Sequence, residues 1–438
     1  MHRAPVRHVY KLLVALGLTI LSCPIVCLGD EVQDNVDRLV RDLNSDQLSE
    51  RDQAEAALIK LGPAALKSLP SELDKLPAET AQRLRRIRTK LEHAQADESA
   101  QAGLVTLSAK NQPLSEVLKA ILDQTGNKVV DYRAQFNEDE TEKKITLELA
   151  KAPFWKALDQ LLDQAGMTVY AYGDERGTFI VTRPPGQVAR SVGVSYSGPF
   201  RVEAVRVEGS RELRLQKAGS LKLLVAIAWE PRLAPIAISH PLEGLQITGD
   251  SGEKLAVDGS EGQPEAEIQD MSSTVELELP LVLPPRSITK IARLTGKFHA
   301  LLPGPVEEFR FTRLTPSKPD RPQKIEKRKG DVTVGIERLR QNNEIWECTL
   351  RVAFGKPSAG LETHRGWILA NEVYFVDPSG KQTPAGGYEL VSQSANEVGI
   401  KYLFELPEGL KGLSLVYKTP LTIQQIPVSY ELQGIELP

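Results

Sequence analysis

A gapless internal repeat constrains the fold of this 438-residue chain more than any other feature. Residues 105–130 (VTLSAKNQPLSEVLKAILDQTGNKVV) align with residues 145–170 (ITLELAKAPFWKALDQLLDQAGMTVY) at a constant offset of 40 residues. Each copy has the pattern of an alternating strand, an amphipathic helix that follows a proline and ends at a glycine, and a second strand. One copy cannot bury the apolar face of its helix alone, so we expect both copies to pack together as one α/β module spanning 103–183.

Residues 104–182 resemble the short N-terminal domain of secretins and TonB-dependent signalling receptors. The segments that carry the resemblance are VTLSAKNQPLSEVLKAIL, KKITLELAKAPFWKALDQLL and DQAGMTVYAY. The resemblance implies a module that binds other proteins on the periplasmic side of an outer-membrane machine. The alternating, aromatic-flanked spans of the membrane barrel that follows in those families are not seen in this sequence.

The first 29 residues have the pattern of a secretory signal peptide. Arg3, Arg7 and Lys11 precede an apolar run, and the small residues Cys27 and Gly29 precede a cleavage position. An uncleaved anchor and a lipoprotein signal at Cys23 are the alternatives. We therefore expect an exported protein, periplasmic or extracellular, with no integral membrane span after signal cleavage.

Residues 30–98 have helical periodicity, and the helix-pair rhythm of 31–95, centred on SERDQAEAALIKLGPAALKSL, resembles HEAT-like repeats. A basic row follows in the last helix at Arg83, Arg85, Arg86, Arg88 and Lys90. Because Leu84, Ile87 and Leu91 form the apolar stripe of that helix, the row is interpreted as a solvated face. The formal net charge of −4 gives no general reason to bind nucleic acid.

Strand patterns separated by turn signals fill the rest of the chain. We expect one β-sandwich at 196–316, a charged linker at 317–330 and a second β-sandwich at 331–438. The C-terminal half contains the segments HRGWILANEVYFVDPSG and LSLVYKTP, and with them it resembles exported bacterial proteins of unassigned function. The predicted fold is multidomain α+β: an N-terminal helical HEAT-like segment, a small α/β module of two β-α-β repeats, and two antiparallel β-sandwich domains.

No pattern in the sequence predicts a catalytic, metal or cofactor site. After signal cleavage Cys348 is the remaining cysteine, and strand alternation places it in a core. The histidines at 93, 240, 299 and 364 lie more than fifty residues apart, and the acidic loops lack a calcium-binding spacing. We expect a protein without a cofactor and without enzymatic activity.

Two residues of the second repeat copy are candidates for a partner contact. Trp155 lies at the edge of its helix's apolar stripe, next to Phe154, and Ser115 occupies the equivalent position of the first copy. The predicted function is therefore that of an exported, non-catalytic interaction or scaffold protein that docks a protein of the cell envelope through this module. The alternative is an exported hydrolase or glycan-binding protein with a site in the β-sandwich half, where Trp367, Tyr374 and Tyr388 could stack on a sugar.

Overall fold

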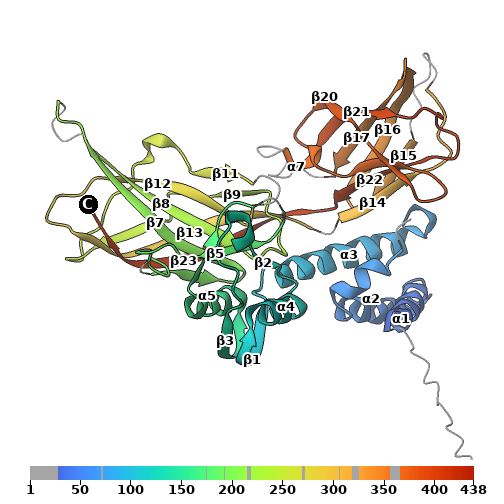
Figure 1. The fold of residues 1–438 in the computed structure, drawn as a ribbon. Helices are drawn as coiled ribbons and strands as arrows, with labels where there is room; N and C mark the ends of the chain where they lie inside the picture. Colours follow the sequence, from blue (N-terminus) through green and yellow to red (C-terminus); the bar gives the residue numbers. More distant parts are fainter. Residues whose placement is uncertain are drawn as a thin grey trace, which may run out of the picture.

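The computed structural model describes residues 28–438 except 71–72, 174, 192, 215–218, 269–271, 305, 318–324 and 356–365. The described chain is a mixed α+β structure in which strands predominate. Two β-sandwiches lie end to end, with the α/β module beside the first and the helical segment beneath the second (Figure 1). The predicted signal peptide lies outside the described residues, apart from its last two positions, which begin the first helix.

The helical segment consists of three α-helices and two short 3-10 helices: α1 (Leu28–Asp42), α2 (Leu48–Lys60), η1 (Pro63–Lys67), η2 (Leu73–Lys75) and α3 (Ala78–Ser99). Apolar residues at helical spacing form its core, including Val36, Leu58 and Ile87. Gly62 adopts a positive φ of 72° between α2 and η1, which a side chain would disfavour.

The basic row of α3 is not a simple solvated face. Arg83 is buried, and its guanidinium lies 2.9 Å from the Glu55 carboxylate of α2. Arg86 binds the same carboxylate at 2.6 Å, and this hydrogen bond is the main cause of a lowered pKa at Glu55. These ion pairs hold α3 against α2, because a carboxylate between two guanidinium groups is stabilised in its charged form.

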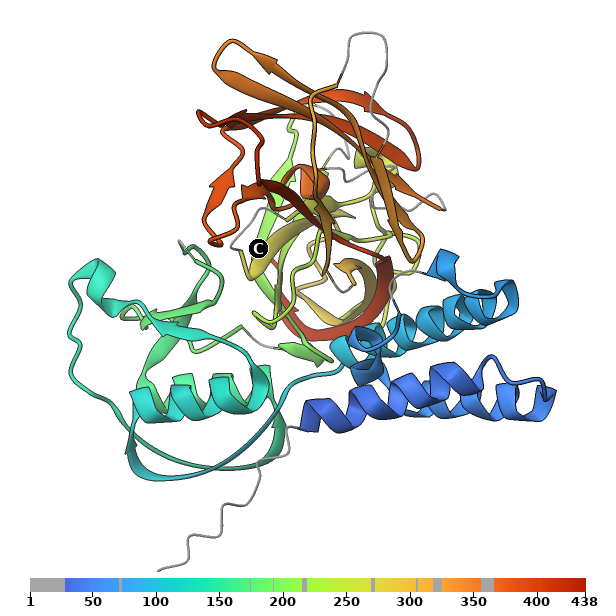
Figure 2. The same ribbon diagram turned by 90° about the vertical axis from the view of Figure 1, so that its right-hand side faces the viewer.

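Both repeat copies form the expected strand, helix and second strand. The elements are β1 (Leu104–Pro113), α4 (Leu114–Thr125), β2 (Val129–Asp131), η3 (Arg133–Phe136), β3 (Lys144–Pro153), α5 (Phe154–Ala165), β4 (Met167–Tyr170) and β5 (Thr178–Thr182). Strands β1 and β3 pair antiparallel, while β5 lies between β2, to which it is parallel, and β4, to which it is antiparallel. The two helices lie between this ribbon and the three-stranded sheet (Figures 1 and 2).

The two copies exchange matching hydrogen bonds. The amide of Asn111 donates to the hydroxyl of Thr146, and the amide of Lys151 donates to the hydroxyl of Thr106, at 3.0 and 3.2 Å. Both donors adopt a positive φ, 54° and 50°. The sequence repeat is therefore also a repeat of backbone conformation and hydrogen bonding.

The first sandwich has two facing sheets around one core. One sheet has the order β12-β8-β7-β6, and in the other β13 pairs with β10 and β9 on one side and with β23 on the other. The bounds are β6 (Ser195–Ser197), β7 (Phe200–Arg211), β8 (Gly219–Trp229), β9 (Ala237–Ser239), β10 (Gln246–Gly249), η4 (Gly259–Glu261), β11 (Glu265–Glu267), β12 (Thr274–Val282), β13 (Lys290–Pro303) and β23 (Ile423–Glu436).

The second sandwich packs the sheet β15-β16-β17-β21-β20 against the sheet β14-β22-β18-β19. Its elements are β14 (Val306–Phe311), β15 (Ile325–Lys329), β16 (Val332–Asn342), β17 (Ile345–Phe354), α7 (Gly366–Leu369), β18 (Val373–Val376), β19 (Gln382–Pro384), β20 (Gly387–Gln393), β21 (Glu397–Glu405) and β22 (Ser414–Pro420). Along β17, buried and half-buried residues alternate, as the period of two predicts.

Three strands depart from the expected domain boundaries. Strand β23 falls in the expected 331–438 domain but pairs along its length with β13 of the first sandwich. Strand β14 falls in the expected 196–316 domain but pairs with β22 of the second sandwich. Residues 325–329, expected in the linker, form β15. The chain therefore crosses between the sandwiches twice. Strand pairing rather than sequence order decides to which sandwich each strand belongs.

Candidate functional site

The two predicted contact residues are buried inside the molecule. Phe154 has no exposed surface, and Trp155 is 2% exposed. The indole Nε1–H of Trp155 donates to the Pro199 carbonyl at 3.1 Å, and the core of the module includes Ala228 of the first sandwich. The expected partner contact is thus wrong for both residues, because the first sandwich of the same chain covers this side of the module.

A buried carboxylate reinforces this internal contact. Asp159 lies one turn after Trp155 on α5 and is 4% exposed. It accepts a hydrogen bond from the Tyr196 hydroxyl at 2.5 Å and another from Arg201 Nε at 3.0 Å, both from the first sandwich. Burial, together with this hydrogen bond, raises the pKa of Tyr196, so the phenol stays a proton donor to Asp159.

A second buried carboxylate ties the other end of the module to the first sandwich. Glu230 follows β8 and is fully buried. It accepts hydrogen bonds from the Gly103 amide at 2.8 Å, from Asn127 Nδ2 at 2.8 Å and from Arg232 Nε at 2.6 Å. Since a buried charge is costly unless its hydrogen bonds are satisfied, this network holds the module in one orientation.

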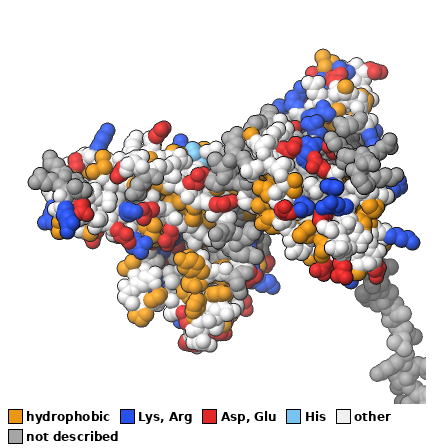
Figure 3. All heavy atoms as spheres, turned by 90° about the horizontal axis from the view of Figure 1, so that it is seen from above, with side chains coloured by type: hydrophobic (Ala, Val, Ile, Leu, Met, Phe, Trp, Pro, Cys, Tyr) orange, Lys and Arg blue, Asp and Glu red, His pale blue; other side chains and the backbone are white. Residues whose placement is uncertain are grey.

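The module's outer sheet face carries a cluster of aromatic rings. Tyr132 packs at 4.9 Å between ring centroids on Phe179 and at 6.1 Å on Tyr170, and Tyr170 in turn contacts Phe136 at 5.1 Å and Tyr172 at 5.7 Å. Phe179 is buried beneath the others, while Phe136 is 47% and Tyr172 is 72% exposed. We call these five residues the aromatic face. Hydrophobic side chains gather on the lobe that the module forms at the lower edge of Figure 3.

Local structure holds the aromatic face in place. Arg133, 3% exposed, binds the Asp131 carboxylate at 2.6 Å and the Asp139 carbonyl at 2.7 Å, which fixes η3 over the sheet. At Gly173 an added Cβ would lie 1.9 Å from the ring of Phe179, so the turn can pass over this ring only with a glycine there.

The sequence patterns did not predict the aromatic face. These rings follow no helical or strand period, because they come from the ends of strands and from η3. A usable signal lay just beyond the aligned repeat, since Tyr132 and Tyr172 are also separated by 40 residues. These two tyrosines align with each other when the alignment of the two copies is continued by two residues.

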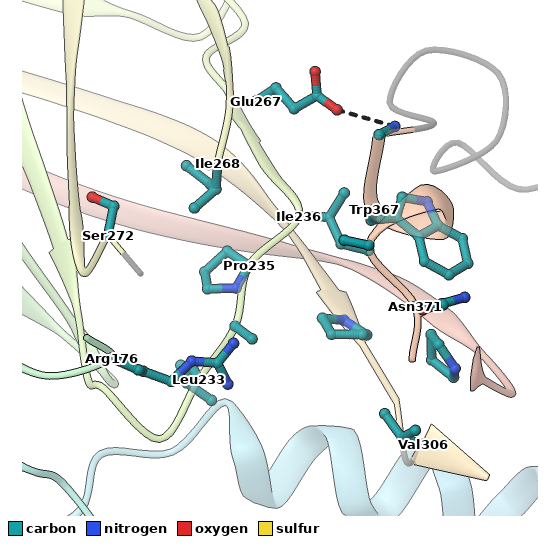
Figure 4. Close-up of a pocket in the computed structure, with 15 residues that line it drawn as sticks. Arg176, Leu233, Pro235, Ile236, Glu267, Ile268, Ser272, Val306, Trp367 and Asn371 are labelled. Carbon is teal, nitrogen blue, oxygen red and sulfur yellow. Dashed lines mark hydrogen bonds between the residues drawn. The ribbon is translucent and has the colours of Figure 1, made fainter. Parts of the chain in front are cut away.

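A cavity of about 440 Å³ lies between the two sandwiches, close to the module's Arg176 (Figure 4). The ring of Trp367 lines it and makes an edge contact with Phe354 at 6.0 Å between ring centroids. Glu267 accepts a hydrogen bond from the Gly366 amide at 3.2 Å across the cavity. Among the described lining residues, Arg176 and Glu267 are the ionisable ones, so the cavity offers polar anchors without a close acid–base pair.

The other aromatic candidates in the sandwich half lie in different surroundings. Tyr374 is buried at 7% exposure, whereas Tyr388 is 53% exposed on β20. Asn371, which lines the cavity, donates to the hydroxyls of Tyr417 and Thr419 at 2.9 and 3.0 Å. The three aromatic residues proposed to stack on a sugar are therefore not brought together on one surface.

A smaller cavity of about 260 Å³ lies between α3 and the second sandwich. Glu92 of α3 lines it and is 7% exposed. Burial raises the pKa of Glu92 to about 7, and the carboxylates of Asp331 and Glu307 act in the same direction against Arg88. This carboxyl therefore changes its charge near neutral pH.

The expected core position of Cys348 is confirmed. The side chain is fully buried, and burial raises the pKa of its thiol to about 12, so it is not a thiolate at neutral pH. His240 is also buried, and its Nε2 lies 2.8 Å from the Tyr430 hydroxyl. Within the described ranges, no three histidine, cysteine, aspartate or glutamate side chains gather in a metal-binding arrangement.

The helices of residues 28–438 that the structure describes include none with the length and apolar character needed to cross a membrane. Comparison of the chain with protein-family models, with curated proteins and with solved structures yields no match.

Proposed function

We propose that this chain is an exported, non-catalytic interaction or scaffold protein of the cell envelope, and that the aromatic face is the surface through which it binds a partner protein. The observation that carries the proposal is the exposure of Phe136 and Tyr172 within a packed aromatic cluster. Tyrosine and phenylalanine are enriched at protein interfaces, and contiguous apolar patches on a soluble protein mark contact sites.

The module's attachment to the first sandwich supports this role. Its inner side is fixed by Trp155, Asp159 and Glu230, so the outer sheet face is the side presented to other molecules. A rigidly held surface loses less conformational entropy on binding than a mobile one. The resemblance of 104–182 to the short N-terminal domain of secretins and TonB-dependent receptors favours a protein as the partner.

The fine architecture and the compartment belong to the same proposal. The helical segment would be a HEAT-like cap, and the chain would reach the periplasm or the exterior through the signal peptide at 1–29. Neither feature is needed for the aromatic face to bind a partner, so each is open to a separate test. N-terminal sequencing of the secreted form would locate the cleavage position.

Site-specific photo-crosslinking tests the aromatic face. A benzophenone amino acid replaces Tyr172 in the full chain, which is expressed in its own cells. A matched protein carries the same group at Leu213, which lies between β7 and β8 and is 93% exposed. We expect a discrete crosslinked partner from position 172 alone, with a yield that Phe136→Ser lowers by roughly tenfold. Equal crosslinks from both positions, or no effect of Phe136→Ser, would contradict the proposal.

The cavity beside Trp367 supports a second candidate, a glycan-binding protein, whereas its described lining lacks the close acid–base pair that a hydrolase would need. Its volume is sufficient for a small ligand, and an indole ring with amide and carboxylate groups nearby suits a sugar. Calorimetric titration with oligosaccharides, comparing the unchanged protein with Arg176→Gln, tests this candidate. Binding that weakens in the variant supports it, and no heat with any oligosaccharide counts against it.

A further inference from the structure

Strand β20 forms one edge of the five-stranded sheet of the second sandwich, at the side away from the helical segment (Figure 1). It pairs with β21 along one side. Among the described residues, no strand pairs with its other side. The outward N–H and C=O groups of β20 are therefore open to another strand.

Two apolar side chains of β20 are exposed although they belong to the core side of the sheet. Tyr388 and Leu390 lie opposite Tyr402 and Ile400, whose side chains are in the sandwich core. Directly opposed residues of an antiparallel pair share a face of the sheet. Yet Tyr388 is 53% and Leu390 is 45% exposed. The facing sheet ends at the three-residue strand β19, so the core is open along β20.

Other sheet edges of this molecule carry protective charges. At the opposite edge of the same sheet, β15 has the sequence IEKRK, with three consecutive basic residues. The edge strand β12 of the first sandwich carries Glu276, Glu278 and Pro280. Charged residues and proline on edge strands prevent pairing with other chains.

Strand β20 has little of this protection. Its one acidic or basic residue, Glu389, is paired with Lys401 of β21. The β-bulge between Leu390 and Ser392 is its remaining protective feature, and it lies beyond Tyr388. The same sheet therefore has charged residues that disfavour strand pairing at its β15 edge and few such residues at its β20 edge.

We propose that β20 is a strand-addition site and that its occupant is β20 of a second copy of this chain, paired antiparallel across a two-fold axis. A two-fold contact needs a self-complementary patch, and a nearly neutral apolar edge meets its own copy without clustering like charges. A register centred on Leu390 opposes the two Leu390 side chains and keeps the two open cores on the same side. A register centred on Glu389 would oppose two carboxylates and is disfavoured.

The self-association is weak, because a single strand pair buries less surface than a standard stable interface. Sedimentation velocity on the full chain, from about 1 to 200 µM, covers the range in which a contact of this size is populated. We expect a monomer–dimer equilibrium that Leu390→Lys weakens by roughly tenfold or more. The matched control Leu213→Lys adds the same charge at an exposed leucine of the other sandwich and leaves the equilibrium unchanged.

Charge complementation distinguishes pairing of β20 from general loss of structure. Leu390→Lys and Leu390→Glu are each expected to sediment as monomers with unchanged melting temperatures, and an equimolar mixture is expected to dimerise again. A monomer at all concentrations of the unchanged protein, a dimer insensitive to Leu390→Lys, or a mixture that fails to associate would each overturn the proposal. The aromatic face plays no part in this test, so its outcome is independent of the function proposed above.

Discussion

Helices α4 and α5 occupy equivalent places in the two repeat copies. The side of α5 that carries Trp155 is docked against the first sandwich, whereas the equivalent side of α4 faces solvent. Among the equivalent positions that differ between them, two bear on docking: Ser115 against Trp155, and Lys119 against Asp159. Ser115 and Lys119 are exposed, whereas Trp155 and Asp159 are buried against the first sandwich. The repeat therefore provides two similar scaffolds, and a few side chains decide which copy binds the rest of the molecule.

The largest effect is expected from giving α5 the serine of α4. Trp155→Ser removes a buried indole together with its hydrogen bond to the Pro199 carbonyl, which costs about 4 kcal/mol of unfolding free energy. Urea denaturation followed by circular dichroism measures the loss. The mirror change Ser115→Trp at an exposed site is the control and should stay within about 0.5 kcal/mol. Equal effects of the two changes would contradict the comparison.

The second exchange, Asp159→Lys, is expected to destabilise the protein by about 3 kcal/mol. It removes the acceptor of Tyr196 and places a positive charge beside Arg201 and Arg190. Faster hydrogen exchange of amides at 195–201 would report the loosened contact. Lys119→Asp, the reverse exchange on α4, should change neither measurement.

The contact between the helical segment and the second sandwich is expected to make the stability of the protein depend on pH, through Glu92 of α3. Glu92 has an ordinary pKa of 4.5 that rises to about 7 in the folded protein, so the folded state binds a proton that the unfolded state releases between these values. Its contribution to stability therefore falls as the pH rises from about 4.5 to 7 and is constant above that range. Glu92→Gln should raise the unfolding free energy at pH 8 by about 2 kcal/mol and leave it nearly unchanged near pH 5. Thermal melts at both values test this, and an equal effect at both would exclude a titrating Glu92.

The smallest effects test whether the two copies are energetically equal. Thr106→Val and Thr146→Val each remove one acceptor of the reciprocal hydrogen bonds with Lys151 and Asn111. Each change is expected to cost about 1 kcal/mol, with the two values agreeing within a few tenths. Denaturation of both variants under the same condition measures the two losses of unfolding free energy. A clear inequality would show that the two copies are not energetically equal.

Much of the local structure was predictable because it depends on neighbours in sequence. The strand, proline, helix and glycine order of both copies follows from periodicity and from Gly126 and Gly166, which end their helices with positive φ. The alternation through Cys348 likewise predicted a buried side chain. In each case the signal and the structure span fewer than about 20 residues, over which the periods of 3.6 and 2 apply.

The candidate site was not predictable in the same way. The unmatched Trp155 indicated a contact, and the structure has that contact within the chain rather than with a partner. The aromatic face follows no local pattern because its rings come from separate elements: Tyr132 and Phe136 from one copy, and Tyr170 and Tyr172 from the other. Side chains that meet across two strands and a 3-10 helix leave no period in the sequence.

The sequence alone determined the duplicated module, the helical character of the N-terminal segment and the β-rich character of the rest. Only the tertiary structure decided that β14 and β23 exchange between sandwiches, that α5 rather than α4 is docked, and that β20 is an open edge. The physical reason is that strand pairing and burial are relations between distant segments. A strand's own residues specify its two faces, but which strand pairs with it depends on the rest of the chain.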